Sequence, residues 1–371
     1  MKTINKTEDA PEFEVEKVQK LWEREYSPFT LSSYEIAAKL LTSGEFGKNN
    51  LTLNLLVYKN GKASQYRSFH EQDSTVKAFF EVLIKNKALL EKVYSGYISA
   101  AEYILDSFKK ILDSNSFDEN FITSLNHNFG NFAGHAFIIQ RGVDYLKDYT
   151  EHKEIYNKLV DLRKKYELVF GGEFEKHLRT LWNKIGKNMR KPHLLGLMSL
   201  DELIHFLRNN KLPNNLEGRE KGTVISIGMP PVESLLIEGK PAEKIINLLD
   251  EKTLKEASQL TGNLQGLVVY DKSIKGEVQI IKNFKDLDKF KQGKILVVPS
   301  TLPKYELCYK KAIGIIADEG GLLSHAAIFC REFKIPGIIG TKYATKILND
   351  GDFVELDTTT GVVRILNKNG K

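Results

Sequence analysis

The feature that most constrains the fold of this chain is a change in hydrophobic periodicity near residue 250. Between residues 74 and 207 apolar side chains recur at the spacing of amphipathic helices, which predicts several long antiparallel helices. Beyond residue 265 short apolar runs are bounded by glycine or aspartate, a pattern typical of buried strands. A chain of 371 residues is long enough for two or three domains, and we expect the boundary where the pattern changes.

The N-terminal part is predicted to be mostly helical, with one small β-hairpin. The dipeptide Asn60-Gly61 separates two strand-like runs within residues 51–69, which predicts a hairpin turn at this position. Ser199 and Glu202 form a capping box, which predicts a helix over residues 200–207. We also expect a flexible arm at residues 1–15, short helices at 16–26 and 33–41, longer helices at 117–146, 152–170 and 174–185, a strand at 222–227 and a helix at 242–249.

The C-terminal part is predicted to be a compact domain of strands and short helices. We expect a first domain over residues 16–250, a linker over 251–264 and a second domain over 265–371. Predicted strands lie at 276–281, 295–298, 313–317, 338–339, 353–356 and 362–366, with helices after His325 and at 344–348.

One histidine stands out in the C-terminal part, at the end of the segment Gly-Gly-Leu-Leu-Ser-His, residues 320–325. Ser324 is placed to cap a helix that begins with His325. The N-terminus of a helix favours an anion, because N–H groups and the helix dipole point there. Neutral imidazole is abundant at pH 7 and is a nucleophile without a separate base. This layout suits a histidine that accepts a phosphoryl group.

Neighbouring residue types fit the same chemistry. Gly320 and Gly321 let the backbone approach a phosphate closely and can adopt positive φ, and Ser324 can donate to a phosphate oxygen. Arg331 lies nearly two helical turns after His325, so it either contacts the phosphate, pairs with a neighbouring carboxylate or meets a partner. Residue types alone also allow a non-catalytic alternative, in which the histidine is an ordinary residue at the start of a helix or on the surface.

An ordered series of short motifs surrounds this histidine. The motifs are Gly293–Val297, Thr301–Pro303, Ala317–Gly321, Ser324–Ile328, Arg331-Glu332, Ile335–Gly337, Gly340-Thr341, Ala344-Thr345, Asp350–Asp352 and Asp357. Through them, residues 293–361 resemble the mobile phosphohistidine domain of the phosphoenolpyruvate-utilising enzymes, which include phosphoenolpyruvate synthase, pyruvate phosphate dikinase and rifampin phosphotransferase. His325 falls on the position that this family phosphorylates. Leu323 departs from the threonine usual in the synthase and the dikinase, and is more similar to the rifampin phosphotransferase branch.

The resemblance implies a swivelling carrier domain. In that family an ATP-grasp domain phosphorylates the histidine, and the carrier then swings to deliver the phosphoryl group to a second site. We find no glycine-rich nucleotide-binding motif in this chain, and no segment that resembles an ATP-grasp module or a phosphoenolpyruvate-binding barrel. The resemblance therefore implies a phosphotransferase component that works with a separate ATP-grasp protein, with Mg²⁺ arriving with ATP and no metal held by this chain.

Two alternatives remain open at this level. The chain is either a non-catalytic binding or regulatory module that retains the mobile domain, or the partner of a separate phosphoenolpyruvate-binding barrel. The expected fold is the same for all of them. It is an α+β multidomain protein, with an N-terminal mostly α-helical domain that includes a small β-hairpin, and a C-terminal β/β/α swivelling phosphohistidine domain.

The helical part is expected to bind a small-molecule acceptor, as the corresponding segment does in rifampin phosphotransferase. His127 and His135 bracket a segment rich in asparagine, glycine and aromatic residues, and would lie on nearly one face of a helix. Together with Arg141 they are candidates for holding an acceptor hydroxyl near a general base. Arg219 is a candidate for an anionic acceptor. The alternatives are tight helix packing for the histidine segment and an ordinary surface role for Arg219.

Composition argues against several other classes of function. The net charge is +6, but the lysines are spread over the whole chain, so we expect no nucleic-acid partner. The two cysteines, Cys308 and Cys330, give neither a disulfide framework nor metal-ligand spacing. No apolar run has the length of a membrane span, and the N-terminus lacks the pattern of a signal peptide. We therefore expect a cytoplasmic protein with no membrane partner.

Overall fold

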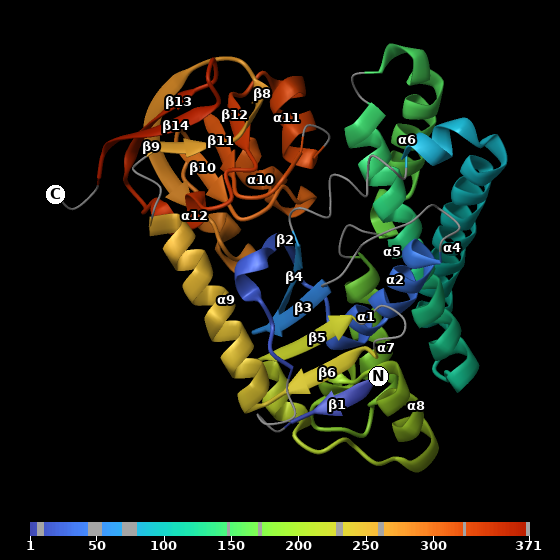
Figure 1. Ribbon diagram of the computed structural model, residues 1–371. Helices are drawn as coiled ribbons and strands as arrows, with labels where there is room; N and C mark the ends of the chain where they lie inside the picture. The colour runs from blue at the N-terminus through green and yellow to red at the C-terminus, as the bar shows by residue number, and fades with distance from the viewer. Residues whose placement is uncertain are drawn as a thin grey trace. The chain divides into compact units, whose positions relative to one another are not determined.

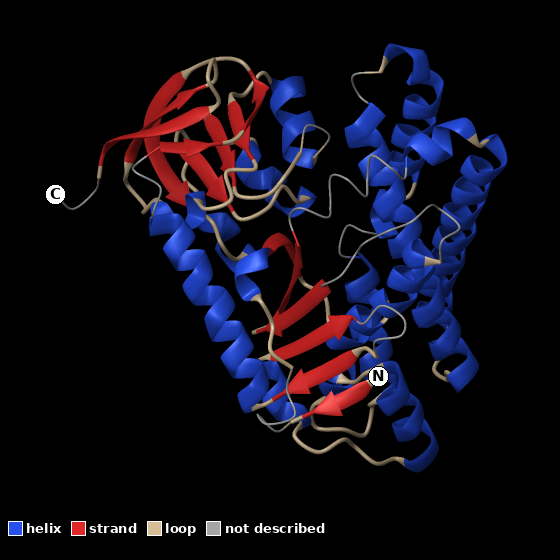
Figure 2. Ribbon diagram, in the orientation of Figure 1, coloured by secondary structure: helices blue, strands red, loops and turns tan. Residues whose placement is uncertain are grey.

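The chain folds into two compact units, Met1–Leu248 and Leu249–Lys371. The computed structural model describes residues 1–5, 11–43, 54–68, 80–146, 149–169, 173–227, 233–258, 263–321 and 324–368. Each unit contains a mixed β-sheet together with helices (Figure 1, Figure 2), which confirms the mixed α and β content expected from the sequence.

The N-terminal unit is built on a six-stranded sheet, not only on a small hairpin as predicted. Its strands run in the order β1-β6-β5-β3-β4-β2. β1 is parallel to β6, and the other neighbours are antiparallel. The strands are β1 (Lys2–Ile4), β2 (Val18–Arg24), β3 (Asn54–Lys59), β4 (Lys62–Ser68), β5 (Thr223–Ile227) and β6 (Leu235–Glu238).

Two predictions at the start of the chain are wrong for the same reason. Residues 18–24, predicted as part of a helix, form β2, which pairs with β4. Residues 2–4, predicted as part of a flexible arm, form β1, which pairs with β6 more than two hundred residues later. In both cases long-range strand pairing overrides a weak local preference. The predicted hairpin turn is confirmed, since Asn60 and Gly61 both have positive φ, at 51° and 81°.

Helices make up most of the remaining N-terminal unit. They include α1 (Pro28–Ser32), α2 (Tyr34–Thr42), α4 (Lys87–Asp113), α5 (Glu119–Leu146), α6 (Lys153–Lys165), α7 (Phe174–Ile185), α8 (Leu200–Asn209) and the first part of α9 (Lys240–Ser258), which continues past the end of the unit at Leu248, with 3-10 turns at Val15–Lys17, Thr150–His152, Pro192–Leu197 and Leu216–Glu220. The capping box at the start of α8 is confirmed. Helix α9 continues to Ser258, so the first part of the predicted linker at 251–264 is helical; residues 259–262 lie outside the described residues.

The C-terminal unit is built on one eight-stranded sheet. Its order is β7-β14-β13-β9-β10-β11-β12-β8, and only Gly266 separates the two end strands β7 and β8 along the chain. A Cβ at Gly266 would lie 2.5 Å from the carbonyl oxygen of Ile339, so the connection between β7 and β8 needs glycine. The strands are β7 (Asn263–Gln265), β8 (Leu267–Tyr270), β9 (Ile274–Ile280), β10 (Ile295–Val298), β11 (Gly314–Ala317), β12 (Gly337–Ile339), β13 (Phe353–Asp357) and β14 (Val362–Asn367).

The parallel strands β9 to β12 form the middle of this sheet. Side chains of β10 alternate between two cores: Leu296 and Val298 pack with residues of helices, and Ile295 and Val297 pack with residues of β13 and β14. Strands buried on both faces explain the continuous apolar runs in the sequence. The helical elements of this unit are Phe284–Lys289, Pro303–Tyr305, α10 (Glu306–Tyr309), α11 (His325–Phe333) and α12 (Ala344–Ile347).

Candidate functional site

His325 is the first residue of helix α11. Ser324 precedes it with extended backbone, and its Oγ accepts a hydrogen bond from the N–H of Ala327 at 3.3 Å. The predicted cap is therefore present. The backbone N–H of Ser324 donates to the carbonyl of Gly321 at 2.8 Å, which ties the glycine loop to the helix start. The imidazole thus begins a nine-residue helix, where backbone N–H groups lack carbonyl partners within the helix and favour an anion.

The loop before His325 leaves the sheet at the carboxyl end of β11. It stays close to the segment that follows β10, because the N–H groups of Asp318 and Glu319 donate to the carbonyls of Val298 and Pro299. Carboxyl ends of parallel strands meet at one edge of a sheet, and such edges commonly hold ligand sites. The His325 loop is thus built on the most buried strands of the unit.

Gly320 is the position in this loop where glycine is required. Its φ is +130°, and a Cβ there would lie 2.6 Å from Cγ2 of Thr301. Gly321 differs, because a Cβ there meets nothing within 4 Å. The hydroxyl oxygens of Thr301 and Ser324 lie 3.2 and 3.3 Å from that same Cβ position on Gly320. Two hydroxyl groups therefore flank the loop, and a larger residue at position 320 would displace them.

Asp318 anchors the loop to the start of α12. Its carboxylate accepts hydrogen bonds from the backbone N–H of Thr345 at 3.1 Å, from the hydroxyl of Thr345, and from that of Thr341 at 3.4 Å. Burial raises the pKa of Asp318, and the hydrogen bonds from Thr345 work in the opposite direction. Sequence reasoning placed Asp318 and Thr301 in family motifs without assigning them a role. Both act here through distant neighbours that no local pattern reveals.

Arg331 is not brought to His325 by the helix. It is exposed and lies in the last turn of α11, and a separation of six residues corresponds to about 9 Å along the helix axis. Arg331 therefore does not share the first turn of α11 with His325. A contact of Arg331 with a docked partner stays a prediction.

The histidine segment of α5 lies in close helix packing. The imidazole of His135 is buried, with Nδ1 2.8 Å from the carbonyl of Asn131, and a Cβ on Gly96 of α4 would lie 2.3 Å from its Nε2. Gly130 and Gly134 also leave no room for a Cβ, because each lies against residues of α2 or its N-cap. His127 is exposed, so the structure does not bring the two histidines to one site. The packing alternative accounts for His135 and the glycines.

Arg219 is engaged by two carboxylates. It is 1% exposed, and its Nε donates to Glu238 while Nη1 and Nη2 donate to Glu202, at 2.6 to 2.7 Å. Nη1 also donates to the carbonyl of Leu197 at 3.0 Å. With its donors taken in this way, Arg219 is a structural ion-pair residue, and the geometry gives no support to the predicted role in binding an acceptor.

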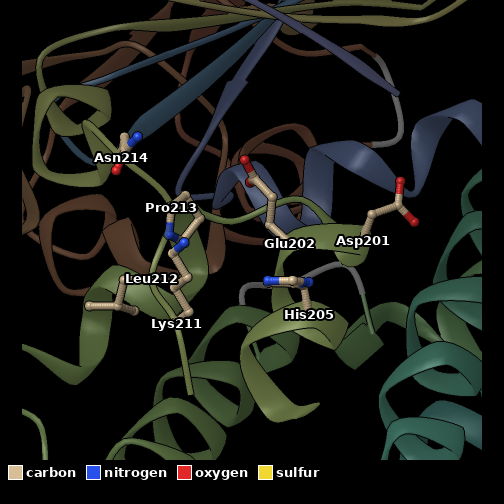
Figure 3. A pocket seen from close by; sticks show the side chains of 7 residues that line it. All are labelled: Asp201, Glu202, His205, Lys211, Leu212, Pro213 and Asn214. Atoms are coloured by element: carbon tan, nitrogen blue, oxygen red, sulfur yellow. The ribbon is translucent and has the colours of Figure 1, made fainter. Parts of the chain in front are cut away.

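A surface pocket of the N-terminal unit lies beside α8 and the loop that follows it (Figure 3). It is lined by Asp201, Glu202, His205, Lys211, Leu212, Pro213 and Asn214. None of the predicted site residues lines it. Its two carboxylates disfavour an anion, and Glu202 is already held by Arg219 and by the cap of α8. We assign no phosphoryl-transfer role to this pocket.

Among the described residues, no group of three or more His, Cys, Asp or Glu side chains is arranged to hold a metal ion. In that same part of the chain, no helix combines the length and the apolar character needed to cross a membrane.

Comparison with known proteins finds a family match within the C-terminal unit. Residues 290–361 match the family model described as PEP-utilising enzyme, mobile domain. This match confirms the resemblance seen in the sequence. The match covers the loop, His325 and α11, together with strands β10 to β13.

Relatives agree with this match. The chain is 33% identical to a probable phosphoenolpyruvate synthase of Archaeoglobus fulgidus over 169 residues, which is 45% of this chain and 21% of the relative. It is 32% identical to the uncharacterized phosphotransferase YvkC of Bacillus subtilis over 142 residues, which is 38% of this chain and 16% of the relative. The chain thus spans about a fifth of the length of these curated relatives. They support a phosphotransferase-type module.

A solved structure of Enzyme I, determined in solution by NMR, aligns with 76% of this chain and 80% of its own length at 14% identity. The TM-score of 0.20 is too low to establish a shared arrangement.

Proposed function

We propose that this chain is a phosphotransferase component that carries a phosphoryl group on His325. The observation that carries the proposal is the position of His325 as the first residue of α11, behind the Ser324 cap, within the segment that matches the mobile domain. The N-terminal unit would hold the acceptor. The phosphoryl donor would be ATP bound with Mg²⁺ in an ATP-grasp protein or domain outside these 371 residues.

The chemistry consists of two displacements at phosphorus. In the first, a nitrogen of neutral His325 attacks the donor phosphorus, an N–P bond forms, and the donor O–P bond breaks with its electron pair on the leaving oxygen. In the second, a hydroxyl of the acceptor attacks, an O–P bond forms, and the N–P bond breaks to regenerate imidazole. The hydroxyl proton passes to a base or to water.

The residues around His325 would stabilise the charge on the phosphoryl oxygens. N–H groups in the first turn of α11 are preorganised donors, and their effect is strongest where negative charge develops in the transition state. The Ser324 hydroxyl accepts one hydrogen bond from Ala327 and still carries its own proton to donate. Gly320 keeps the loop free of a side chain beside these donors.

Labelled ATP tests this proposal. The protein would be incubated with its ATP-grasp partner and with ATP labelled at the β-phosphate or, separately, at the γ-phosphate. We expect label that is labile in acid and stable in alkali, present on the natural protein and absent from His325→Ala. The labelled position identifies which phosphate moves. Equal labelling of both proteins would refute the role of His325.

Absence of label separates the alternatives. If ATP gives none, the same experiment with labelled phosphoenolpyruvate and a barrel partner tests the other donor. If phosphoenolpyruvate labels the protein, phosphoenolpyruvate and not ATP is the donor, and His325 remains the proposed carrier. No label from either donor would favour a binding or regulatory module.

A further inference from the structure

The N-terminal unit contains a buried guanidinium group, two of whose nitrogens have no hydrogen-bond partner among the described residues. Arg67 lies on β4 and is 6% exposed. Its Nε and Nη1 are buried and have no hydrogen-bond partner in the part of the chain that the structure describes. Burying an unpaired cation is costly, and buried charges are normally paired. A ligand that brings a negative charge would explain why this position holds an arginine.

A second arginine lies beside the same aromatic ring. The Cζ atom of Arg67 is 4.8 Å from the ring centroid of Phe137, and that of Arg141 is 5.6 Å from it. Arg141 is 32% exposed, and its carboxylate neighbour Asp144 is at 3.8 Å, the length of a loose ion pair. Burial, followed by the charge of Arg141, lowers the pKa of Arg67 to about 10, so Arg67 stays charged at neutral pH. Two like charges therefore stand close together.

The sheet beside Arg67 presents polar groups. Asn54 on β3 is paired with Arg67 in the strand register, and Gln65 lies two residues before Arg67 on the same face. Both amide side chains are buried at 3% exposure, and Nε2 of Gln65 donates to Oδ1 of Asn54 at 2.8 Å. A buried stripe of amide and guanidinium groups is unusual for a protein interior, where apolar residues predominate. These amide groups lie on the same face of the sheet as Arg67.

We propose that Arg67 and Arg141 form a binding site for an oxyanion, the carboxylate or phosphate group of a small molecule. Guanidinium groups bind both kinds of oxyanion through charge-assisted hydrogen bonds. Arg141 is partly exposed and gives access from solvent, while Arg67 supplies the buried donors. Within the proposed function, this molecule is the phosphoryl acceptor. The binding of an anion itself does not depend on that role.

Thermal unfolding of the isolated protein tests the site without any phosphoryl donor. The natural protein would be compared in sodium phosphate, sodium acetate and sodium chloride at equal ionic strength. A ligand that binds only the folded state raises the unfolding temperature. Phosphate also stabilises proteins in general because it is excluded from their surface. Arg67→Met is therefore measured in parallel, with Arg208→Met as the control for an exposed arginine of the same unit that is paired with Glu119.

We expect phosphate or acetate to raise the unfolding temperature of the natural protein and of Arg208→Met relative to chloride. The specific shift should be lost in Arg67→Met, as expected for a rise in Kd of at least about tenfold when charge-assisted hydrogen bonds are removed. A response to phosphate alone would assign a phosphate group, and a response to acetate alone a carboxylate. Equal responses of the natural protein and Arg67→Met would overturn the proposal.

Two further measurements keep the test decisive. If Arg67→Met does not fold, Arg67→Lys retains the charge but not the planar donors, and should lose most of the shift. Hydrogen exchange should show slower exchange with the anion in β4 and α5, which carry Arg67, Phe137 and Arg141. Slower exchange confined to the His325 loop would instead assign the anion to the C-terminal unit. If the anion-binding proposal fails in this test, the prediction that His325 becomes labelled is unaffected. The two proposals can therefore be refuted independently.

Discussion

Two arginines of the N-terminal unit are similarly removed from solvent but have opposite surroundings. Arg219 is 1% exposed and donates to Glu202, Glu238 and a backbone carbonyl. Arg67 is 6% exposed, and two of its nitrogens have no partner among the described residues. A buried cation held by carboxylates is part of the fold, whereas one without them is a cost that a ligand can offset. The comparison separates an arginine that supports structure from one that we propose binds a ligand.

The largest effect should come from Arg219→Met. This change leaves Glu202 and Glu238 partly or fully buried without their cation, and breaking a buried ion pair in this way costs about 3–5 kcal/mol. Urea unfolding at pH 7 measures the change in the free energy of unfolding. A loss below about 1 kcal/mol would mean that Arg219 is no more structural than Arg67.

The same variant should show an altered dependence on pH. Burial raises the pKa of Glu202, but hydrogen bonds and the charge of Arg219 outweigh burial and hold this pKa below its usual value of 4.5. A carboxyl group with a lowered pKa stabilises the fold above its unfolded pKa, and this contribution is lost as the pH falls through the folded pKa. The difference between the natural protein and Arg219→Met should therefore be largest near pH 7 and shrink below about pH 4.5. Urea unfolding at pH 7 and pH 4 compares them, and a difference that grows on acidification would contradict the ion pair.

In contrast to Arg219→Met, the variant Arg67→Met should not lower the free energy of unfolding. Removing a buried donor that lacks a partner relieves a penalty of about 1–3 kcal/mol, while the loss of the contact with Phe137 removes about 0.5–2 kcal/mol. In buffer without phosphate or carboxylate we expect the free energy of unfolding to stay unchanged or to rise by about 1 kcal/mol. A loss of several kcal/mol would place Arg67 with Arg219 as a structural residue.

The smallest effect concerns the helix cap next to the Arg219 ion pairs. Ser199→Ala removes the acceptor for the N–H of Glu202, and such a loss costs about 1 kcal/mol. Ser199→Gly is the matched control, because glycine at a cap costs only a few tenths of a kcal/mol. If urea unfolding shows Ser199→Ala to be as destabilising as Arg219→Met, the cap and not the ion pair holds this corner of the unit.

The sequence was informative where structure is set locally. The Asn60-Gly61 turn, the caps at Ser199 and Ser324, and the apolar strand at residues 295–298 were predicted from neighbouring residues, and the structure confirms them. Helical spacing at residues 18–24 predicts a helix, but these residues form a strand, because their pairing with β4 is not encoded in nearby residues.

Partners distant in the sequence explain what sequence reasoning missed in the candidate sites. The sequence allows an anion-binding role or an ordinary surface role for Arg219, and neither anticipates its ion pairs with Glu202 and Glu238. No local pattern marks Arg67, because Phe137 and Arg141 lie some seventy residues further along the chain. The role proposed for His325 rests on a local motif, which the sequence alone is sufficient to show.

The measurement that most directly tests the central claim is the mass of the intact protein after reaction with ATP and the ATP-grasp partner. We predict an increase equal to one phosphoryl group, reversed by acid, with no increase for His325→Ala. The variant should unfold in urea like the natural protein, since the imidazole is at a partly exposed helix start. The same increase in the variant, or a phosphoryl group that survives acid on another residue, would contradict the account.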